Sequence, residues 1–292
     1  MRAFLCALFV LSSLLMARTA HAQTATDVFA ERSLAIVIDD RCSMFSDRER
    51  NTLTASWLQS RGTLLRSGYS AEDIRSTFET IVRRAANQPC DSEATLALIA
   101  GVRGAFELFS RLPALDYPGQ ARLWSAVRRR DEYPVWTLSQ TIANEVDAPR
   151  FGLYSDASGE RLTLSLPTTP APASVVLVIR DVEVAANPYD PTLGGLFSVT
   201  DRPEWARLAP PPHAQSRIWA SNRRIVEERL FFGFPETATQ ALAMLDPREA
   251  VRLELYDARG EMTGQYYVEI GDFAAGTAFL AAGHIYLTSP GG

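Results

Sequence analysis

The chain has 292 residues and a formal net charge of −5 at pH 7. A mildly acidic chain lacks the clustered positive surface that nucleic-acid binding needs, so we expect no nucleic-acid partner. All 29 basic residues are arginines, which excludes mechanisms that depend on a lysine, such as a Schiff base.

The first predicted element is a signal peptide over residues 1–22. Arg2 precedes an apolar run from Ala3 to Met16, and Ala20-His21-Ala22 has the small-x-small pattern of a cleavage site. The run is shorter than the roughly 20 residues that a transmembrane helix needs. We therefore expect an exported chain, periplasmic or secreted, that starts at Gln23 and has no transmembrane segment.

Two cysteines, Cys42 and Cys90, remain after this cleavage, since Cys6 lies in the signal peptide. In an oxidising compartment such a pair forms a disulfide by default. A catalytic thiol needs a histidine partner, but His213 and His284 lie far along the chain. A zinc site needs more Cys or His at ligand spacing. We therefore predict a Cys42–Cys90 disulfide and no metal site.

The residues up to Arg130 have a helical pattern. Pro113 ends the fourth predicted helix, and a last helical piece is expected over Gln120 to Arg130. Asp39 and Asp40 are interpreted as a solvated helix end. The four main helices run over Ala25 to Asp40, from the capping box at Ser46 to Gly68, from Ser70 onward, and over Leu96 to Leu112. Short connections between them favour an antiparallel bundle.

From Asp131 onward the pattern changes to short strands rich in β-branched and aromatic residues. They are expected over Tyr133 to Leu138, Phe151 to Tyr154, Arg161 to Leu166, Ser174 to Ile179, Gly195 to Val199, Arg229 to Phe234, Val251 to Tyr256 and Tyr266 to Ile270. Helical pieces are expected over Glu236 to Leu245 and Asp272 to Ala282. We therefore predict an α+β protein. A disulfide-stapled helical bundle over residues 23–130 precedes a mostly antiparallel β-sandwich or barrel over 131–292 with two short helices.

Several short motifs of this second half come in an informative order. They are Tyr133 to Trp136, Leu164 to Pro167, Val175 to Arg180, Ala241 to Leu245, Ala250 to Leu255, and Val268 to Phe273 followed by Ala278 to Leu280. This order resembles the invasion-associated locus B family of exported bacterial β-domains, although the cysteines usual in that family are missing. The resemblance covers none of the helical half. It implies a small periplasmic β-domain without catalytic residues to carry over.

No catalytic motif is recognised in the sequence. Gly260 to Gly264 has the spacing of a Gly-x-Ser-x-Gly motif but offers a threonine. His213 and His284 lie outside any metalloprotease or zinc pattern, and phosphate-binding glycine patterns are missing. We therefore expect no cofactor and favour a protein without catalytic activity.

The best candidate contact site is an arginine run between two tryptophans. It consists of Trp124, Arg128, Arg129, Arg130 and Trp136. Guanidinium groups bind anions through paired hydrogen bonds and stack on aromatic rings, so this cluster suggests an anionic glycan or lipid headgroup as ligand. The alternative is a cluster of ion pairs with the acids that follow, at the junction of the two predicted domains.

We therefore expect a binding or structural component of the cell envelope, whose partner is another envelope protein or an anionic glycan or lipid headgroup. One alternative is an envelope hydrolase that acts on a glycan or peptide, with a scattered active site at the domain junction. Another is a module that offers the edge of a β-strand to an envelope complex, which predicts an uncovered apolar strand. The sequence sets neither the activity nor the oligomeric state.

Overall fold

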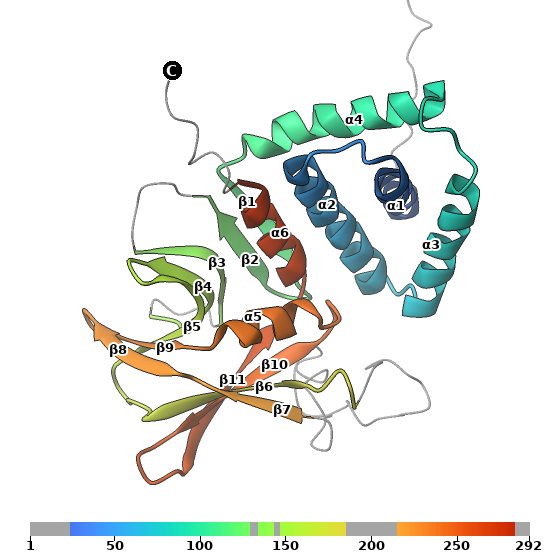
Figure 1. Ribbon diagram of the computed structural model, residues 1–292. Coiled ribbons are helices and arrows are strands. Elements are labelled where there is room, and N and C mark those ends of the chain that lie inside the picture. The colour runs from blue at the N-terminus through green and yellow to red at the C-terminus, as the bar shows by residue number, and fades with distance from the viewer. Residues whose placement is uncertain (1–23, 129–133, 143–146, 185–214, 284–292) are drawn as a thin grey trace, which may run out of the picture.

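The computed structural model describes residues 24–128, 134–142, 147–184 and 215–283. Four helices come first, followed by a β-rich part that carries two further helices (Figure 1). The first four are α1 (Ala25–Cys42), α2 (Asp47–Arg66), α3 (Ala71–Ala85) and α4 (Glu93–Ser110). α1 contacts the other three. It is seen end-on in Figure 1 while α4 crosses beside it, so the helices do not all share the single axis of the predicted bundle.

Each of these helices begins at a hydroxyl side chain that accepts a hydrogen bond from a backbone N–H of the first turn. The capping residues are Thr24, Ser46, Ser70 and Ser92. The predicted capping box at Ser46 is confirmed, because Glu49 in turn accepts the backbone N–H of Ser46. These caps satisfy N–H groups that have no partner inside their helix.

The Cys42–Cys90 disulfide is present and connects the end of α1 to the segment before α4. The interpretation of Asp39 as solvated is wrong, because its side chain is buried. Its carboxylate accepts hydrogen bonds from the backbone N–H of Phe45, at 2.8 Å, and from Arg50 Nε, at 2.7 Å. A buried carboxylate with such partners holds the α1–α2 turn together.

The β-rich part consists, within the described residues, of two antiparallel sheets. The seven-stranded sheet has the order β1-β2-β3-β4-β5-β9-β8, with β1 (Ala114–Pro118), β2 (Leu123–Val127), β3 (Val135–Thr141), β4 (Arg150–Asp156), β5 (Gly159–Pro167), β9 (Arg229–Gly233) and β8 (Asn222–Val226). The four-stranded sheet has the order β11-β10-β6-β7, with β11 (Met262–Glu269), β10 (Ala250–Tyr256), β6 (Ser174–Arg180) and β7 (Gln215–Trp219). The remaining helices are α5 (Glu236–Ala243) and α6 (Phe273–Gly283). The predicted α+β class, with helices first and a mostly antiparallel β-rich part after them, is thus confirmed.

The helical piece predicted over Gln120 to Arg130 is wrong, because this segment contains β2, which pairs with β1. Its residues alternate between buried and exposed along the strand, with Trp124 and Ala126 turned inward. β1, β7 and β8 were not predicted either, and the strand expected over Gly195 to Val199 lies outside the described residues. The change from helix to strand comes at Ala114, and the division into domains at residue 130 stays a prediction.

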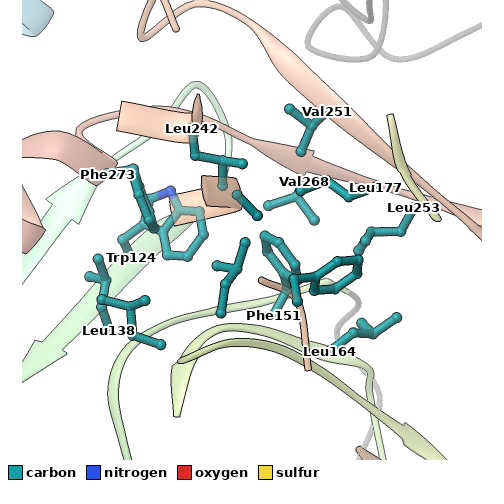
Figure 2. Packing of buried hydrophobic residues seen from close by; sticks show 14 of the residues in the cluster. Trp124, Leu138, Phe151, Leu164, Leu177, Leu242, Val251, Leu253, Val268 and Phe273 are labelled. Carbon is teal, nitrogen blue, oxygen red and sulfur yellow. The ribbon is translucent and has the colours of Figure 1, made fainter. Parts of the chain in front are cut away.

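The main hydrophobic core lies between the two sheets and is closed by α5 and α6 (Figure 2). Trp124, Leu138 and Phe151 come from the larger sheet, and Leu177 and Leu253 come from the smaller one. Since side chains alternate along a strand, each strand of the larger sheet that supplies this core also presents residues on the opposite face. This opposite face, called the outer face below, carries the candidate site.

Helix α6 lies between the helical part and the larger sheet and contacts α2 as well as β1, β2 and β3 (Figure 1). Close approach to β3 needs a small residue at Gly276, where an added Cβ would lie 2.7 Å from Leu138 Cδ1. On the other side, the ring of Phe279 meets that of Phe109 at a centroid distance of 5.1 Å. The helical and β-rich parts therefore share an apolar interface through α6.

Candidate functional site

The two tryptophans of the predicted cluster lie on opposite faces of the larger sheet. Trp124 is fully buried in the core, and its indole N–H donates to the carbonyl oxygens of Glu269 and Ile270 at 3.0 and 2.9 Å. Trp136 is half-buried and lies on the outer face. Trp124 therefore supports the fold, and only Trp136 is accessible to a ligand.

A β-bulge accounts for this separation. Trp136 pairs with Tyr154, whereas Leu138, two residues later, pairs with Leu153, so the register shifts between Trp136 and Leu138. Without the extra residue, Trp136 and Leu138 would point to the same face. Thr137 occupies the bulge, where its hydroxyl donates to the backbone oxygen of Leu153 at 3.3 Å. The bulge thus turns Trp136 outward while Leu138 stays in the core.

Arg128, the one arginine of the run that the structure describes, joins three elements. Its Nε donates to the carbonyl oxygen of Phe279 at 3.0 Å, and Nη1 donates to that of Phe109 at 3.1 Å. Its guanidinium carbon lies 3.5 Å from the centroid of the Phe279 ring. Arg129 and Arg130 lie outside the described residues. The structure therefore does not bring Arg128 together with Trp136.

Trp136 is instead part of an aromatic cluster on the outer face. Its ring centroid lies 5.0 Å from that of Tyr154 and 6.5 Å from that of Phe231, and the last two rings are 5.0 Å apart. These residues come from β3, β4 and β9. Tyr154 and Phe231 are buried by their neighbours, so Trp136 is the ring that remains partly open to a ligand.

Two arginines flank Trp136, and the described residues provide neither with a carboxylate partner. Arg150 is exposed, and its guanidinium carbon lies 5.8 Å from the centroid of the Trp136 ring. Arg229 donates through Nε to Ser165 Oγ at 2.8 Å and through Nη2 to the Ala148 oxygen at 3.0 Å, so its bonds go to neutral groups. Partial desolvation of its guanidinium group, and secondly the charge of Arg229, lower the pKa of Arg150. Two cations held close together favour an anion between them.

A pocket of about 200 Å³ lies between these side chains. It is lined by Trp136, Ala148, Arg150, Ser165, Arg229 and Phe231. The hydroxyl of Ser165 accepts from Arg229, so its own hydrogen remains available for an acceptor in the pocket. The pocket thus combines two guanidinium groups, a hydroxyl donor and an aromatic wall, which suits a carboxylate or phosphate group.

A shallow groove of about 650 Å³ adjoins this pocket and shares Trp136 and Arg150 with it. Its other walls are outward-facing side chains of β2 and β3 and the turn before β2, including Leu123, Ser125, Val127, Ser139 and Thr141. The groove is thus lined by hydroxyl groups, apolar side chains and the arginines Arg122 and Arg150. We call Trp136, Arg150, Tyr154, Arg229 and Phe231, together with this groove, the Trp136 surface.

Arg224 marks the far end of the aromatic cluster and differs from the arginines of the pocket. Its guanidinium carbon lies 5.3 Å from the centroid of the Tyr154 ring and 5.5 Å from that of Phe231. It also forms an ion pair with Asp156. Its charge is therefore balanced inside the protein, whereas the charges of Arg150 and Arg229 are not.

Sequence reasoning missed Arg150 and Arg229, which lie far from the arginine run. Two weak signals were present: Arg150 and Tyr154 are four residues apart in β4, and Arg229 and Phe231 are two apart in β9. Residues that are an even number of positions apart in a strand point to the same face, so each pair lies on one face. Nothing in the sequence shows that the two strands, separated only by β5, contribute to the same face.

The described residues give no direct sign of catalysis. Among them, no group of three or more His, Cys, Asp or Glu side chains is placed to bind a metal ion. His213 and His284, on which the hydrolase alternative depends, lie outside this part of the chain. None of the helices described is long and apolar enough to cross a membrane. Comparison with protein-family models, with curated proteins and with solved structures found no match.

Proposed function

We propose that the protein is an exported, non-catalytic binding component of the bacterial cell envelope, and that it binds an anionic glycan on the Trp136 surface. The single observation that carries this proposal is the pair Arg150 and Arg229, which flanks a partly exposed tryptophan without a carboxylate partner among the described residues. An acidic sugar supplies both a carboxylate for the arginines and a ring that packs on Trp136.

Export rests on the sequence pattern of residues 1–22 and is supported by the Cys42–Cys90 disulfide, since disulfides persist in oxidising compartments. The resemblance of the β-rich half to the invasion-associated locus B family belongs to the same proposal. It would make this part a periplasmic β-domain.

An acidic glycan fits the Trp136 surface better than a lipid headgroup does. The groove beside the pocket is long, open and lined with Ser125, Ser139 and Thr141. Hydroxyl groups of this kind exchange hydrogen bonds with sugar hydroxyls. A lipid would require a continuous apolar path for its acyl chains, whereas the apolar side chains of this groove, such as Leu123 and Val127, are interspersed with Arg122 and with hydroxyl groups.

The proposal is tested by calorimetric titration of the full mature protein with a tetramer of galacturonic acid and with the neutral tetramer of N-acetylglucosamine. We expect the acidic tetramer to bind, and its affinity to fall with added salt because the contact is charged. The W136A variant should bind about tenfold more weakly, since a stacking ring is worth about 1 kcal/mol or more. Trp219 is 53% exposed on β7 and provides the matched control, W219A. Equal binding of W136A and W219A, or preference for the neutral tetramer, contradicts the proposal.

A second candidate function is supported by the edge strand β8. Within the described part of the chain it pairs only with β9, and Ile225 and Val226 are 58% and 37% exposed. An open strand edge with apolar side chains can accept a strand from another chain. Binding of an envelope protein at β8 would be lost in the I225K variant, with glycan binding unchanged.

A further inference from the structure

A second cleft, separate from the Trp136 surface, opens between the helical part and the β-rich part. It has a volume of about 540 Å³. One wall comes from α1, α2 and α3, and the other comes from α5, the segment after it and the end of β6. In Figure 1 the α2–α3 connection lies toward the end of the β-rich part that carries α5 and β10. We call it the Arg61 cleft, after a residue of α2 in its wall.

The acidic and basic side chains of the cleft are paired, with one exception. Glu72 forms an ion pair with Arg75. Arg180 is buried, and its Nε and Nη2 each donate to a carboxylate oxygen of Glu249 at 2.8 Å. These charges are therefore balanced within the protein.

The charge of Asp246 acts on the pKa of Arg61. Both oxygens of the Asp246 carboxylate, however, accept hydrogen bonds from Arg248. Arg248 Nε donates to one oxygen at 2.9 Å, and Nη2 donates to the other at 3.0 Å. The backbone N–H of Arg248 donates to the same carboxylate at 3.0 Å. The Asp246 carboxylate therefore pairs with Arg248 and not with Arg61.

Arg61 is the exception, because it has no hydrogen-bond or ion-pair partner among the described residues. Its side chain is half-buried. Burial lowers the pKa of Arg61, Asp246 raises it, and the positive charge of Arg248 lowers it further. Removing water from a cation costs free energy when no partner replaces the water. An anion bound in the cleft would offset this desolvation cost.

Aromatic and apolar side chains line the cleft around Arg61. Trp57 lies one helical turn before it in α2, and its ring centroid is 6.1 Å from Phe29 and 6.0 Å from Phe78. The indole N–H of Trp57 already donates to Ser33 Oγ at 2.9 Å, so the ring offers an apolar wall to a ligand. On the opposite side, Met244 is 65% exposed. Such a thioether side chain adapts its shape to an apolar ligand.

We infer that the Arg61 cleft binds a small organic acid, whose single carboxylate pairs with the Arg61 guanidinium and whose apolar body packs between Trp57, Phe78 and Met244. The cleft has the size of ordinary small-molecule sites. A planar guanidinium binds a carboxylate through two parallel hydrogen bonds, which explains why an arginine is suited to this position. A ligand held there contacts both α2–α3 and the α5–β10 segment.

The inference is tested by titrating the full mature protein with octanoate and with phenylbutyrate, and with octanamide as the neutral counterpart of the first. We expect both acids to bind with a Kd below about 1 mM, and octanamide to bind at least about tenfold more weakly than octanoate, because it lacks the charge. The two acids distinguish a preference for an alkyl body from one for an aromatic body.

The decisive variants are R61Q and, as matched control, R83Q, because Arg83 is an exposed arginine of α3 that donates to Thr80 Oγ1 and lies outside the cleft lining. R61Q should weaken octanoate binding about tenfold or more, and R83Q should leave it within about twofold. R61Q should also keep or raise the melting temperature, since it removes a half-buried charge that has no partner. Absence of binding of both acids, or equal affinity of R61Q and wild type, overturns the inference.

Discussion

Arg66 and Asp272, which lie 206 positions apart in the sequence, form an ion pair with two parallel hydrogen bonds. Nη1 lies 2.7 Å from Oδ1 and Nη2 lies 2.8 Å from Oδ2. The Asp272 side chain is fully buried, and that of Arg66 is 11% exposed. Gly62 leaves room for the carboxylate, since an added Cβ would lie 2.0 Å from Oδ1. This pair fixes the end of α2 to the start of α6 and hence joins the helical part to the β-rich part.

Removal of Arg66 should strongly destabilise the protein. R66Q leaves a buried carboxylate without its cation, and such changes cost about 3–5 kcal/mol. Burial raises the pKa of Asp272 and Arg66 partly offsets this, so R66Q raises the pKa further and its folded form takes up a proton more readily as the pH falls. The loss of unfolding free energy caused by R66Q should therefore be smaller at pH 5 than at pH 8.

The measurement is urea unfolding of R66Q beside R75Q, whose exposed pair with Glu72 is worth about 1 kcal/mol or less. If R66Q loses no more unfolding free energy than R75Q does, the Arg66–Asp272 pair does not hold the two parts together.

The Glu269 carboxylate holds the turn between β1 and β2. It is buried and accepts the consecutive backbone N–H groups of Gln120, Ala121 and Arg122 at 2.7 to 3.1 Å. E269Q replaces the charged acceptor by a neutral amide and turns its NH₂ group toward the N–H of Ala121 at the Oε1 position, so we expect a loss of about 2 kcal/mol of unfolding free energy.

The matched control for E269Q is E261Q, since Glu261 is exposed and should tolerate the change within about 0.5 kcal/mol. G119A should act on the same contact, because its Cβ would lie 2.2 Å from Glu269 Oε2. The two losses should therefore not add in the double variant. Additive losses, measured by chemical unfolding, would show that the turn and the carboxylate act independently.

Glu254 should make stability depend on pH in the acidic range. Its burial raises the pKa, but hydrogen bonds from Tyr256, Arg217 and Arg252 outweigh this, and the pKa lies below its usual value. The unfolded chain therefore takes up the proton first as the pH falls. The stabilisation is present above the unfolded pKa of about 4.3 and is lost as the pH falls through the folded pKa.

The measurement for Glu254 is the unfolding free energy of wild type and E254Q between neutral pH and about pH 3, where unfolded carboxylates gain protons. Wild type should lose more stability over this range, because the glutamine cannot titrate. The same loss in both proteins would mean that other carboxylates cause the acid sensitivity.

The arginine pair of the Trp136 surface should decide the preference for acidic glycans. R150Q should weaken binding of the galacturonic acid tetramer about tenfold, with little effect on folding, because Arg150 is exposed and has no hydrogen-bond or ion-pair partner among the described residues. R161Q is the control, since Arg161 lies on β5 and donates to Ser158 Oγ at 2.7 Å. If R161Q weakens binding as much as R150Q, general charge attraction and not the pocket accounts for the affinity.

The sequence predicts the helical half well because its signals are local. Serine caps and the capping box at Ser46 act over a few residues, and the pairing of two cysteines follows from simple thiol chemistry once a signal peptide is predicted. β2 was missed because its alternation spans only Leu123 to Val127, and the helix formers around it dominate a local window. Sheet pairing with β1 and β3 overrides that preference.

The candidate site was predicted in part only, because its geometry is not local. Trp136 was identified, but a single-residue bulge decides which face it occupies, and no sequence pattern revealed this bulge. Trp124 looks equivalent in the sequence and is a core residue. Arg150 and Arg229 meet only because β4, β5 and β9 are neighbours in the sheet. The strand order, and with it the pocket, comes from the tertiary structure.

The most direct test of ligand binding at the Trp136 surface is fluorine NMR of the mature protein labelled with fluorotryptophan. The chain has five tryptophans, so the signals can be assigned by single substitution to phenylalanine. On titration with the galacturonic acid tetramer, we predict that the Trp136 signal shifts, while those of Trp57, Trp124 and Trp219 stay in place. Titration with octanoate should move Trp57 instead, which keeps the two proposed sites distinguishable. A saturating amount of the tetramer that leaves the Trp136 signal unchanged would contradict the proposed function.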